Sequence, residues 1–562
     1  MAWDGLTSLM ILAAVGSVAR ADAVADSTGE RAPVISRIVI QAGDVIPPWS
    51  AEALTSNPVE RWAYDVANWL HISTRPSVIR RELLFCEGEP LDTLKLQESE
   101  RILRSYVFIN EAEITTRPVG PGEVEVRVRT SDNFSFAPGI ILESGGGTTD
   151  IGFLLVEKNA LGFGKEVALQ YVHEDYRSLG TRQNSWLLEY RDPQLLGTRL
   201  FLQSSASHND YGSAFATSVM RPFYSSTTRY AGGMDFSWFD GRTQIFRYES
   251  VVAEHSGESR SGRAWVGRSW GDQFSRVKLE AITAYEKSLT KPVVKWSGWQ
   301  PRDTMHVSRT TVEPTLTLRR EVNRAYRRMQ YLDDYGVVED VGIGWNAGVG
   351  LGMGVPSQPN RKTYGTAGLF GEWSGVLGNH ITVVRGNVSA RLYDDLGSGR
   401  RAWSNVQTDA FVHHYYRGLP RQTLALSIGW RGGWRVDPPY QIVLGGDVGF
   451  RGYPAYRFEG TRRLLVNAED RIFAPWKIAT LGFGLVVFAD AGYAWPPGEA
   501  VDLRDLYSDG GLGLRVYNTR AATSRVSRID LAFRLRGQRG FQLSFGSEHL
   551  FDLFNRRPTP TR

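Results

Sequence analysis

The sequence predicts a mainly β protein, in which a transmembrane antiparallel β-barrel of about 16 strands follows a small α/β domain. Three observations support this fold class. From about Phe134 onward, side chains alternate between apolar and polar with a period of two. Tyr and Trp gather at the ends of the alternating segments, as in "VVFADAGYAW" and "LSIGWRGGW". No segment contains the roughly 18 consecutive apolar residues that a membrane-spanning helix requires.

The composition narrows the class of protein. The mean hydropathy is −0.28, but alternating strands hide apolar surface from such an average. The formal charge of +5 is small for 562 residues and is not concentrated in one patch, which argues against nucleic-acid binding. Cys86 is the only cysteine, which excludes an intrachain disulfide and a multi-cysteine metal site. We expect Cys86 to be a small buried apolar residue.

Residues 1–23 read as a secretory signal peptide. An apolar run, residues 9–19, is followed by small residues that offer cleavage sites ending at Ala21, Ala23 or Ala25. No Lys or Arg precedes the run, which departs from the usual pattern. The alternative, a membrane anchor, is disfavoured because the run is far shorter than a membrane span.

Residues 35–132 predict the small domain, with the element order β, α, α, β, β. "ISRIVIQ" alternates as a strand, "SVIRRELL" reads as a helix with Ser77 as its N-cap, and "LKLQESERILRS" reads as a second helix that follows Asp92. "FINEAEITTRP" and "GEVEVRVRTSD" read as a hairpin closed by "VGPG". An insertion after the first strand, residues 43–74, looks helical in part.

Residues 133–551 predict the barrel, and residues 552–562 form a short basic tail. In "RIDLAFRLR", Ile529 and Leu531 oppose Asp530, and arginine recurs on the polar face of strand after strand. This alternation suits an apolar outer face and a polar lumen, and sharing about 420 residues among 16 strands leaves about 26 for each strand and its loop. The alternative is a large soluble β-protein.

The first and last barrel strands are expected to meet at a seam. The last strand, "RGFQLSFGSEHLF", alternates aromatic and apolar residues with polar ones and resembles the signal that outer-membrane barrels present to their assembly machinery. The seam strands are expected at about residues 133–143 and 539–548. Glycines and a proline in "NFSFAPGIILESGGG" would weaken pairing there. The seam residues of interest are Phe134, Phe136, Phe541, Leu543 and Phe545.

Several motifs resemble a known family. The small domain looks like a POTRA (polypeptide-transport-associated) domain, and the barrel resembles that of the BamA/TamA superfamily, the bacterial surface antigen family. "LGG…FRGY" resembles the lid-loop motif of that family, and "NAEDRIF" and "VVFADAG" resemble the two strands that follow it. "YRDPQLLGTRL" and "EKNALGFGKEVALQY" resemble segments near the start of the barrel of that family.

The resemblance implies a lid loop that folds back into the lumen. Its arginine, Arg451, would reach acidic residues on the inner wall, with Asp490 as the best match and Glu469 as the second. Gly445 and Gly446 would let the loop turn tightly and lie close to the wall. The alternative is that Arg451 only pins the loop for stability. The lid-loop motif comprises Phe450, Arg451, Gly452 and Tyr453.

The resemblance also implies an outer-membrane insertase or translocator with its POTRA domain in the periplasm. An extended client would add to an exposed strand edge of that domain, and the seam would open laterally. The implied partners are the outer-membrane lipid bilayer, unfolded outer-membrane or secreted clients and periplasmic accessory proteins. No metal, organic cofactor or nucleic acid is implied.

Three other functions are alternatives to this one. A dedicated secretion partner for one substrate usually carries two POTRA domains and a plug helix. In this chain, only the insertion before His71 could supply such a plug. A passive channel lacks a POTRA domain and the lid motif. An enzyme is disfavoured because His413 and His414 are adjacent on a strand and face opposite sides, and no G-x-S-x-G, H-E-x-x-H or P-loop motif occurs. Polar-face carboxylates such as Asp530 and Glu280 are expected to pair with lumenal arginines.

Overall fold

The computed structural model describes most of the chain from residue 32 to residue 547. The expected signal peptide, residues 1–23, and the basic tail, residues 552–562, lie outside the described residues. Within the described part of the chain, no helix is long and apolar enough to cross a membrane. The described ranges are 32–48, 57–145, 147–176, 181–272, 274–296, 307–358, 362–394, 401–437, 440–478, 480–520 and 526–547.

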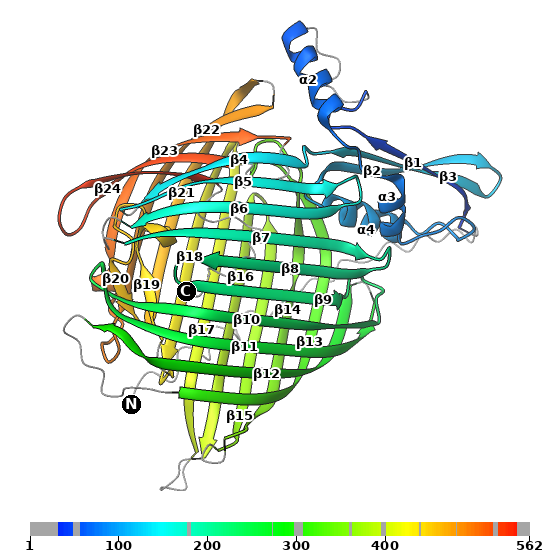
Figure 1. Cartoon of the computed structure of the whole chain (residues 1–562). Helices are drawn as coiled ribbons and strands as arrows, with labels where there is room; N and C mark the ends of the chain where they lie inside the picture. The colour runs from blue at the N-terminus through cyan, green and yellow to red at the C-terminus, as the bar shows by residue number, and fades with distance from the viewer. Residues whose placement is uncertain are drawn as a thin grey trace.

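The small domain packs two of its helices, α3 and α4, on a three-stranded sheet at one end of the barrel (Figure 1). The strand order is β1-β3-β2, with β1 parallel and β2 antiparallel to β3. Its core includes Ile35, Ile79, Leu103 and Val126, all at most 1% exposed. The elements are β1 (Val34–Gly43), α2 (Pro58–Leu70), α3 (Pro76–Glu82), α4 (Thr93–Arg104), β2 (Ile109–Gly120) and β3 (Glu123–Asp132).

Local sequence signals predict some features of the small domain correctly and others wrongly. Asp92 caps α4, because its carboxylate accepts hydrogen bonds from the backbone N of Leu94 at 2.9 Å and of Lys95 at 3.3 Å. The expectation that Ser77 caps α3 is wrong: the helix begins at Pro76, whose fixed φ suits the first helical turn and which needs no donor there. Cys86 is exposed in the turn after α3 and not buried as expected.

Twenty strands within the described residues close into an antiparallel barrel. The expected count of about 16 is wrong because it allowed about 26 residues for each strand and loop, whereas hairpins such as β8–β9 turn through Asp210 and Tyr211 alone. The strands are β4 (Phe136–Gly145), β5 (Thr148–Ala160), β6 (Lys165–Tyr176), β7 (Thr181–Leu195), β8 (Leu200–Asn209), β9 (Gly212–Arg221), β10 (Tyr230–Arg247), β11 (Ser250–Gly271), β12 (Ser275–Trp296), β13 (Val307–Met329), β14 (Glu339–Pro356), β15 (Tyr364–Leu377), β16 (His380–Asp394), β17 (Arg401–Leu419), β18 (Gln422–Trp434), β21 (Arg462–Ile478), β22 (Leu481–Trp495), β23 (Tyr507–Asn518), β24 (Val526–Arg534) and β25 (Phe541–Ser547).

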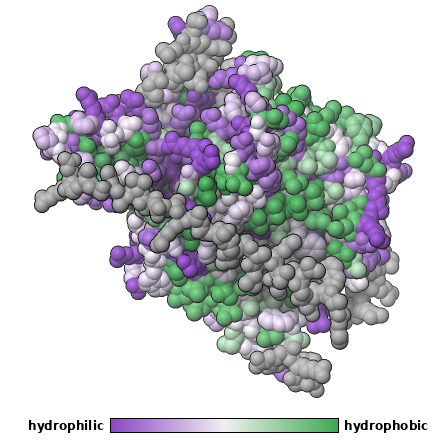
Figure 2. Space-filling view, turned by 180° about the vertical axis from the view of Figure 1, so that it is seen from behind, coloured by the Kyte–Doolittle hydropathy of each residue, from purple (hydrophilic) through white to green (hydrophobic). Residues whose placement is uncertain are grey.

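The two faces of the barrel wall differ as the alternation predicts. On β23, Leu512 is 61% exposed and points outward, whereas Arg515 is buried and points inward. β22 repeats the pattern with Leu485 outside and Asp490 inside. Figure 2 shows hydrophobic residues spread over the barrel wall and hydrophilic ones concentrated on the small domain. The outer wall is therefore an apolar surface around a polar lumen.

The small domain is fixed to one rim of the barrel. Arg104 of α4 donates from Nε and Nη2 to the carboxylate of Asp340 on β14, at 2.8 and 3.2 Å. Gln194, at the end of β7, donates to Glu82 of α3 at 2.5 Å. The helical part of the insertion, α2, lies outside the barrel (Figure 1) and so does not plug the lumen. The loop between β18 and β21 is at the opposite rim.

Candidate functional site in the barrel lumen

The loop after β18 folds back into the barrel. Two short strands, β19 (Ile442–Leu444) and β20 (Phe458–Gly460), pair at its base, and a 3-10 turn, Gly446–Val448, starts its tip. Phe450 and Tyr453 are at most 3% exposed, and their ring centroids lie 4.3 Å apart. The loop is therefore a packed unit that presents Arg451 to the wall. We call residues 440–461 the lid loop.

Arg451 binds both carboxylates that the sequence singled out. Its Nε and Nη2 donate to the two oxygens of Asp490 on β22, each at 2.7 Å. Its Nη1 donates to Oε1 of Glu469 on β21 at 2.8 Å. The guanidinium also lies 3.5 Å from the ring centroid of Phe488. The planar fork of arginine suits this bidentate contact, which the point charge of lysine cannot reproduce.

The surroundings of Arg451 and Tyr453 shift the pKa values of both side chains. Burial alone would lower the pKa of Arg451, but attraction to Asp490 and Glu469 outweighs it and raises the pKa above its usual value. Arg451 is therefore permanently charged. Burial of Tyr453 raises the pKa of its phenol to about 12. That hydroxyl stays protonated and donates to the backbone O of Ser508 at 3.0 Å and of Arg536 at 2.7 Å.

Glycine is required where the loop touches the wall. A Cβ on Gly452 would lie 2.6 Å from Cβ of Asp509, and the Gly452 amide donates to that carboxylate at 2.9 Å. A Cβ on Gly445 would lie 2.2 Å from the carbonyl oxygen of Pro454. Both positions exclude any side chain. Gly446 begins the 3-10 turn at the tip of the loop.

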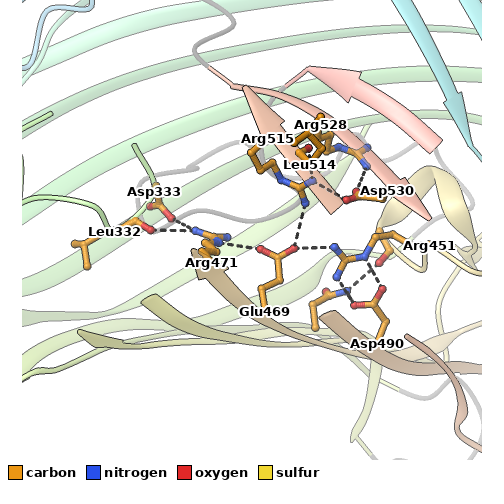
Figure 3. A network of polar contacts seen from close by, with 12 residues as sticks. Leu332, Asp333, Arg451, Glu469, Arg471, Asp490, Leu514, Arg515, Arg528 and Asp530 are labelled. Atoms are coloured by element: carbon orange, nitrogen blue, oxygen red, sulfur yellow. Dashed lines mark hydrogen bonds and ion pairs between the residues drawn. The ribbon is translucent and has the colours of Figure 1, made fainter. Parts of the chain in front are cut away.

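The Arg451 contacts belong to a longer chain of charges (Figure 3). Glu469 Oε2 also accepts from Nε of Arg471 at 2.8 Å, and Arg471 Nη1 donates to Asp333 at 2.6 Å. Asp530 on β24 accepts from Arg515 at 2.6 Å and from Arg528 at 2.9 Å. We call the set of four arginines and four carboxylates the lumenal ladder. Its members are Arg451, Arg471, Arg515, Arg528, Asp333, Glu469, Asp490 and Asp530.

The sequence signals revealed only part of the ladder. Arg471 stands in the motif "NAEDRIF", and Asp530 was expected to pair with some lumenal arginine. The period of two could have placed Arg515 and Arg528 on the inner face. Asp333 lies in a turn between β13 and β14, where no period reveals a side chain's direction.

The far side of the lid loop reaches the opposite wall. Tyr456 stacks on Phe246 of β10, with ring centroids 4.0 Å apart and planes at 12°. Gln441 hydrogen-bonds the backbone N and O of Phe246, at 3.0 and 2.5 Å. Arg457 donates to Glu249 at 2.7 Å. The lid loop thus crosses the lumen from β21–β24 to β10.

The predicted seam residues fall into two groups. Phe136, Phe541 and Leu543 are all more than half exposed on the outer face of β4 and β25, and Phe545 shares that face. Phe134 lies elsewhere: it packs on Val45 and Ile46 at the joint with the small domain, and its amide donates to the backbone O of Arg520 at 2.8 Å. Phe134 is therefore a joint residue.

β25 and β4 close the barrel. Among the described residues, their register joins one pair, Phe545 with Ser144. The register of β24 with β25 runs from Phe533↔Phe541 to Ser527↔Ser547. Pro138 of β4 has no amide hydrogen, so it cannot donate a backbone hydrogen bond to a neighbouring strand.

The two histidines that the sequence singled out face opposite sides of β17. His413 is buried, whereas His414 lies against Thr382 on the outer face, with Nδ1 2.8 Å from Oγ1. Within the described ranges, no group of three or more His, Cys, Asp or Glu is arranged to hold a metal ion. The lumenal ladder holds one loop in one orientation.

Comparisons with known proteins give structural likenesses. No protein-family model matches the chain, and no curated protein does. CdiB from Acinetobacter baumannii is 12% identical, with a TM-score of 0.47 over 92% of this chain and 74% of that one. CdiB from Escherichia coli is 10% identical, with a TM-score of 0.45 over 94% and 93%. BamA from Haemophilus ducreyi lacking POTRA domains 1–3 is 13% identical, with a TM-score of 0.38 over 85% and 82%.

Proposed function

We propose that this protein is an outer-membrane translocator or insertase for polypeptides, of the kind found in the BamA/TamA superfamily. The contact that carries the proposal is the fork of Arg451 on Asp490 and Glu469 inside a closed barrel. The sequence motifs implied this contact, and the arrangement holds a lid across the lumen without covalent chemistry. We propose that the protein is not an enzyme.

The proposed location follows from the two surfaces of the molecule. The apolar outer wall of the barrel would contact the lipid bilayer, which suits side chains such as Leu512 and Leu485. The small domain would then lie in the periplasm as a POTRA domain, below the rim that it contacts. Periplasmic accessory proteins would bind there.

Strand β2 would capture the client. The outer edge of β1 is occupied at its start: the amide of Ile35 donates to Glu89 O at 2.9 Å, and Gly88 donates to Ile35 O at 2.8 Å. β2 is the other edge of the sheet, and residues 115–120 are all exposed. An extended segment could add there by backbone hydrogen bonds, which tolerate many sequences.

The seam would provide the route into the membrane. A strand that pairs with its neighbour along little of its length separates at low cost, and the freed edges can pair with a client. The described register at Phe545 and Ser144 and the proline in β4 support this place for the opening. An insertase would release the client sideways through it.

The second candidate is a dedicated translocator for one secreted substrate. Barrel diameter grows with strand number, so twenty strands enclose a wider lumen than the expected sixteen. A wider lumen favours passage along the barrel axis once the lid loop moves. Insertion and export are thus distinguished by the path of the client.

Depletion of the protein in its own cell, followed by quantitative proteomics of the outer membrane, tests the proposal. Loss of many unrelated barrels would support a general insertase. Loss of one secreted or surface protein would support the dedicated translocator. An unchanged outer membrane, in cells that hold no second protein of this architecture, would contradict both and favour a passive channel. A steady conductance in planar bilayers that is insensitive to Arg451→Ala would then support that channel.

A further inference from the structure

A second segment enters the lumen, from the rim that bears the small domain. It is the turn between β13 and β14, residues 330–338. Leu332 in this turn is fully buried and packs on inward-facing residues of four strands, β14, β16, β17 and β18. These partners are Val341, Ile381, Val383, Tyr415 and Ala425.

The same turn also reaches the wall that carries the lumenal ladder. Tyr335 packs with Phe473 of β21, Tyr517 of β23 and Val526 of β24. Its hydroxyl donates to the backbone O of Ala474 at 2.8 Å. Leu332 and Tyr335 together therefore place the turn against the inner wall from β14 to β24. This arc comprises β14 to β18 and β21 to β24, and thus almost half of the barrel.

Hydrogen bonds hold the turn in a defined shape. The backbone amides of Leu332 and Asp333 donate to the carboxylate of Glu339, at 2.9 and 3.0 Å. Thr423 of β18 donates to the backbone O of Tyr331 at 2.5 Å. The hydroxyl of Tyr415 donates to Asp333 at 3.1 Å. Because these hydrogen bonds satisfy its buried polar groups, the turn is an ordered structural element and not a loosely packed loop.

The turn and the lid loop are joined through two residues. Asp333 binds Arg471, Arg471 binds Glu469, and Glu469 binds Arg451 (Figure 3). When Asp333 leaves, Arg471 keeps its contact with Glu469, so no buried arginine is left alone. Departure of the turn would therefore remove one partner of Arg471 and alter the contacts that Glu469 shares between Arg471 and Arg451.

The small domain contacts both strands that flank the turn. Arg104 of α4 binds Asp340 near the start of β14, and Glu100 of α4 binds Arg328 near the end of β13. The guanidinium of Arg101 also lies 4.3 Å from the ring centroid of Tyr326 on β13. A movement of α4 would therefore act directly on the ends of β13 and β14 at the base of the turn.

We propose that residues 330–338 form a plug at the domain-side mouth of the lumen, which the small domain releases when it takes up a client. Release would loosen the lid loop through Arg471 and Glu469, so the two mouths open together. The inference rests on the proposed function, because it takes the small domain as the client receptor. The plug itself is a property of the barrel alone.

Conductance in planar bilayers tests the plug without any client. The purified full-length protein is compared with Asp333→Asn and with a variant in which residues 331–337 are replaced by glycine and serine. We expect both variants to raise the time spent in open states by about tenfold or more, because each weakens the closed state. Asp235→Asn is the matched control, since Asp235 pairs with Arg263 on β10–β11, away from the plug.

A second readout reports the coupling to the lid. Ala455 is fully buried in the lid loop, so Ala455→Cys in a Cys86→Ser background should react slowly with a maleimide. We expect Asp333→Asn, and Arg104→Ala in α4, to speed this reaction several-fold. Circular dichroism and heat-modifiable migration would establish that each variant folds.

The outcomes separate the plug from the proposed function. Unchanged conductance in both plug variants, when both fold, would overturn the plug. Raised conductance with unchanged labelling of Ala455→Cys would overturn the coupling to the lid. A depletion experiment without any client phenotype would contradict the proposed function while leaving the conductance result intact.

Discussion

The wall of β21–β24 and the seam between β25 and β4 lie side by side but are built in opposite ways. The wall buries paired charges on its inner face, with Arg451 held by Asp490 and Glu469. Among the described residues, the seam has one register pair and an outer row of exposed aromatic and aliphatic side chains. The wall is fixed by directional side-chain contacts, whereas the seam depends on backbone pairing. The two regions are one strand apart, because β24, which carries Asp530 at the end of the lumenal ladder, is the neighbour of the seam strand β25.

Locking the seam should have the largest effect on function. Ser144→Cys with Phe545→Cys, in a Cys86→Ser background, should form a disulfide, because directly opposed residues of antiparallel strands lie about 4.5–5.5 Å apart between Cα atoms. We expect client insertion into vesicles to fall to background under oxidation and to return with reductant.

The matched control for the seam lock joins two strands that are not expected to separate during function. Leu531→Cys with Leu543→Cys bridges β24 and β25, which are in register at that pair. Full activity of the oxidised seam variant would rule out lateral opening. Equal loss in both variants would show that any cross-strand disulfide is harmful.

Removing Arg451 should have the largest effect on stability. Arg451→Ala leaves Asp490 and Glu469 buried beside an empty space, which should cost about 3–5 kcal/mol. Chemical unfolding monitored by fluorescence would measure the loss. Arg451→Lys should recover only part of it, because lysine keeps the charge but not the fork. A loss below about 1 kcal/mol for Arg451→Ala would mean that water replaces the arginine, as at an exposed pair.

Tyr453→Phe should have a smaller effect on the same wall. The change removes the donor to the backbone O of Ser508 and of Arg536 but keeps the ring among Phe450 and Phe458. The expected cost is about 1–2 kcal/mol in the same unfolding experiment. A change at Phe136 in the seam, for example Phe136→Leu, should cost clearly less, since that ring is 57% exposed. The reverse order would contradict the division into a fixed wall and a yielding seam.

Much of the fold could be predicted because its cause is local. The period of two revealed the strands, Asp92 revealed the start of α4, and "VGPG" revealed the hairpin turn. The strand count could not be predicted in the same way, because the expected count assumed one average length for a strand and its loop. The real strands differ in length, and some hairpin turns contain only two residues. Ser77 misled because Pro76, one residue earlier, already satisfies the needs of a first helical turn.

The candidate site was predictable only where motif and face coincide. Arg451 stands in the lid-loop motif, and Glu469 and Asp490 stand in strand motifs and face inward by alternation. The plug did not show itself, since Leu332 and Asp333 owe their positions to strands that are distant in the chain. Which inward charges meet across a lumen depends on closure of the whole barrel, and no local pattern encodes it.

The lumenal ladder also affects the movement of ions through the barrel. Its four arginines and four carboxylates sum to zero, and so do the three arginines and three carboxylates that stay on the wall when Asp333 and Arg451 move. Open pores acquire ionic preference from uncompensated rings of one sign. The ladder by itself would therefore favour neither cations nor anions, and a passing segment would meet no electrostatic trap there, whatever its own net charge.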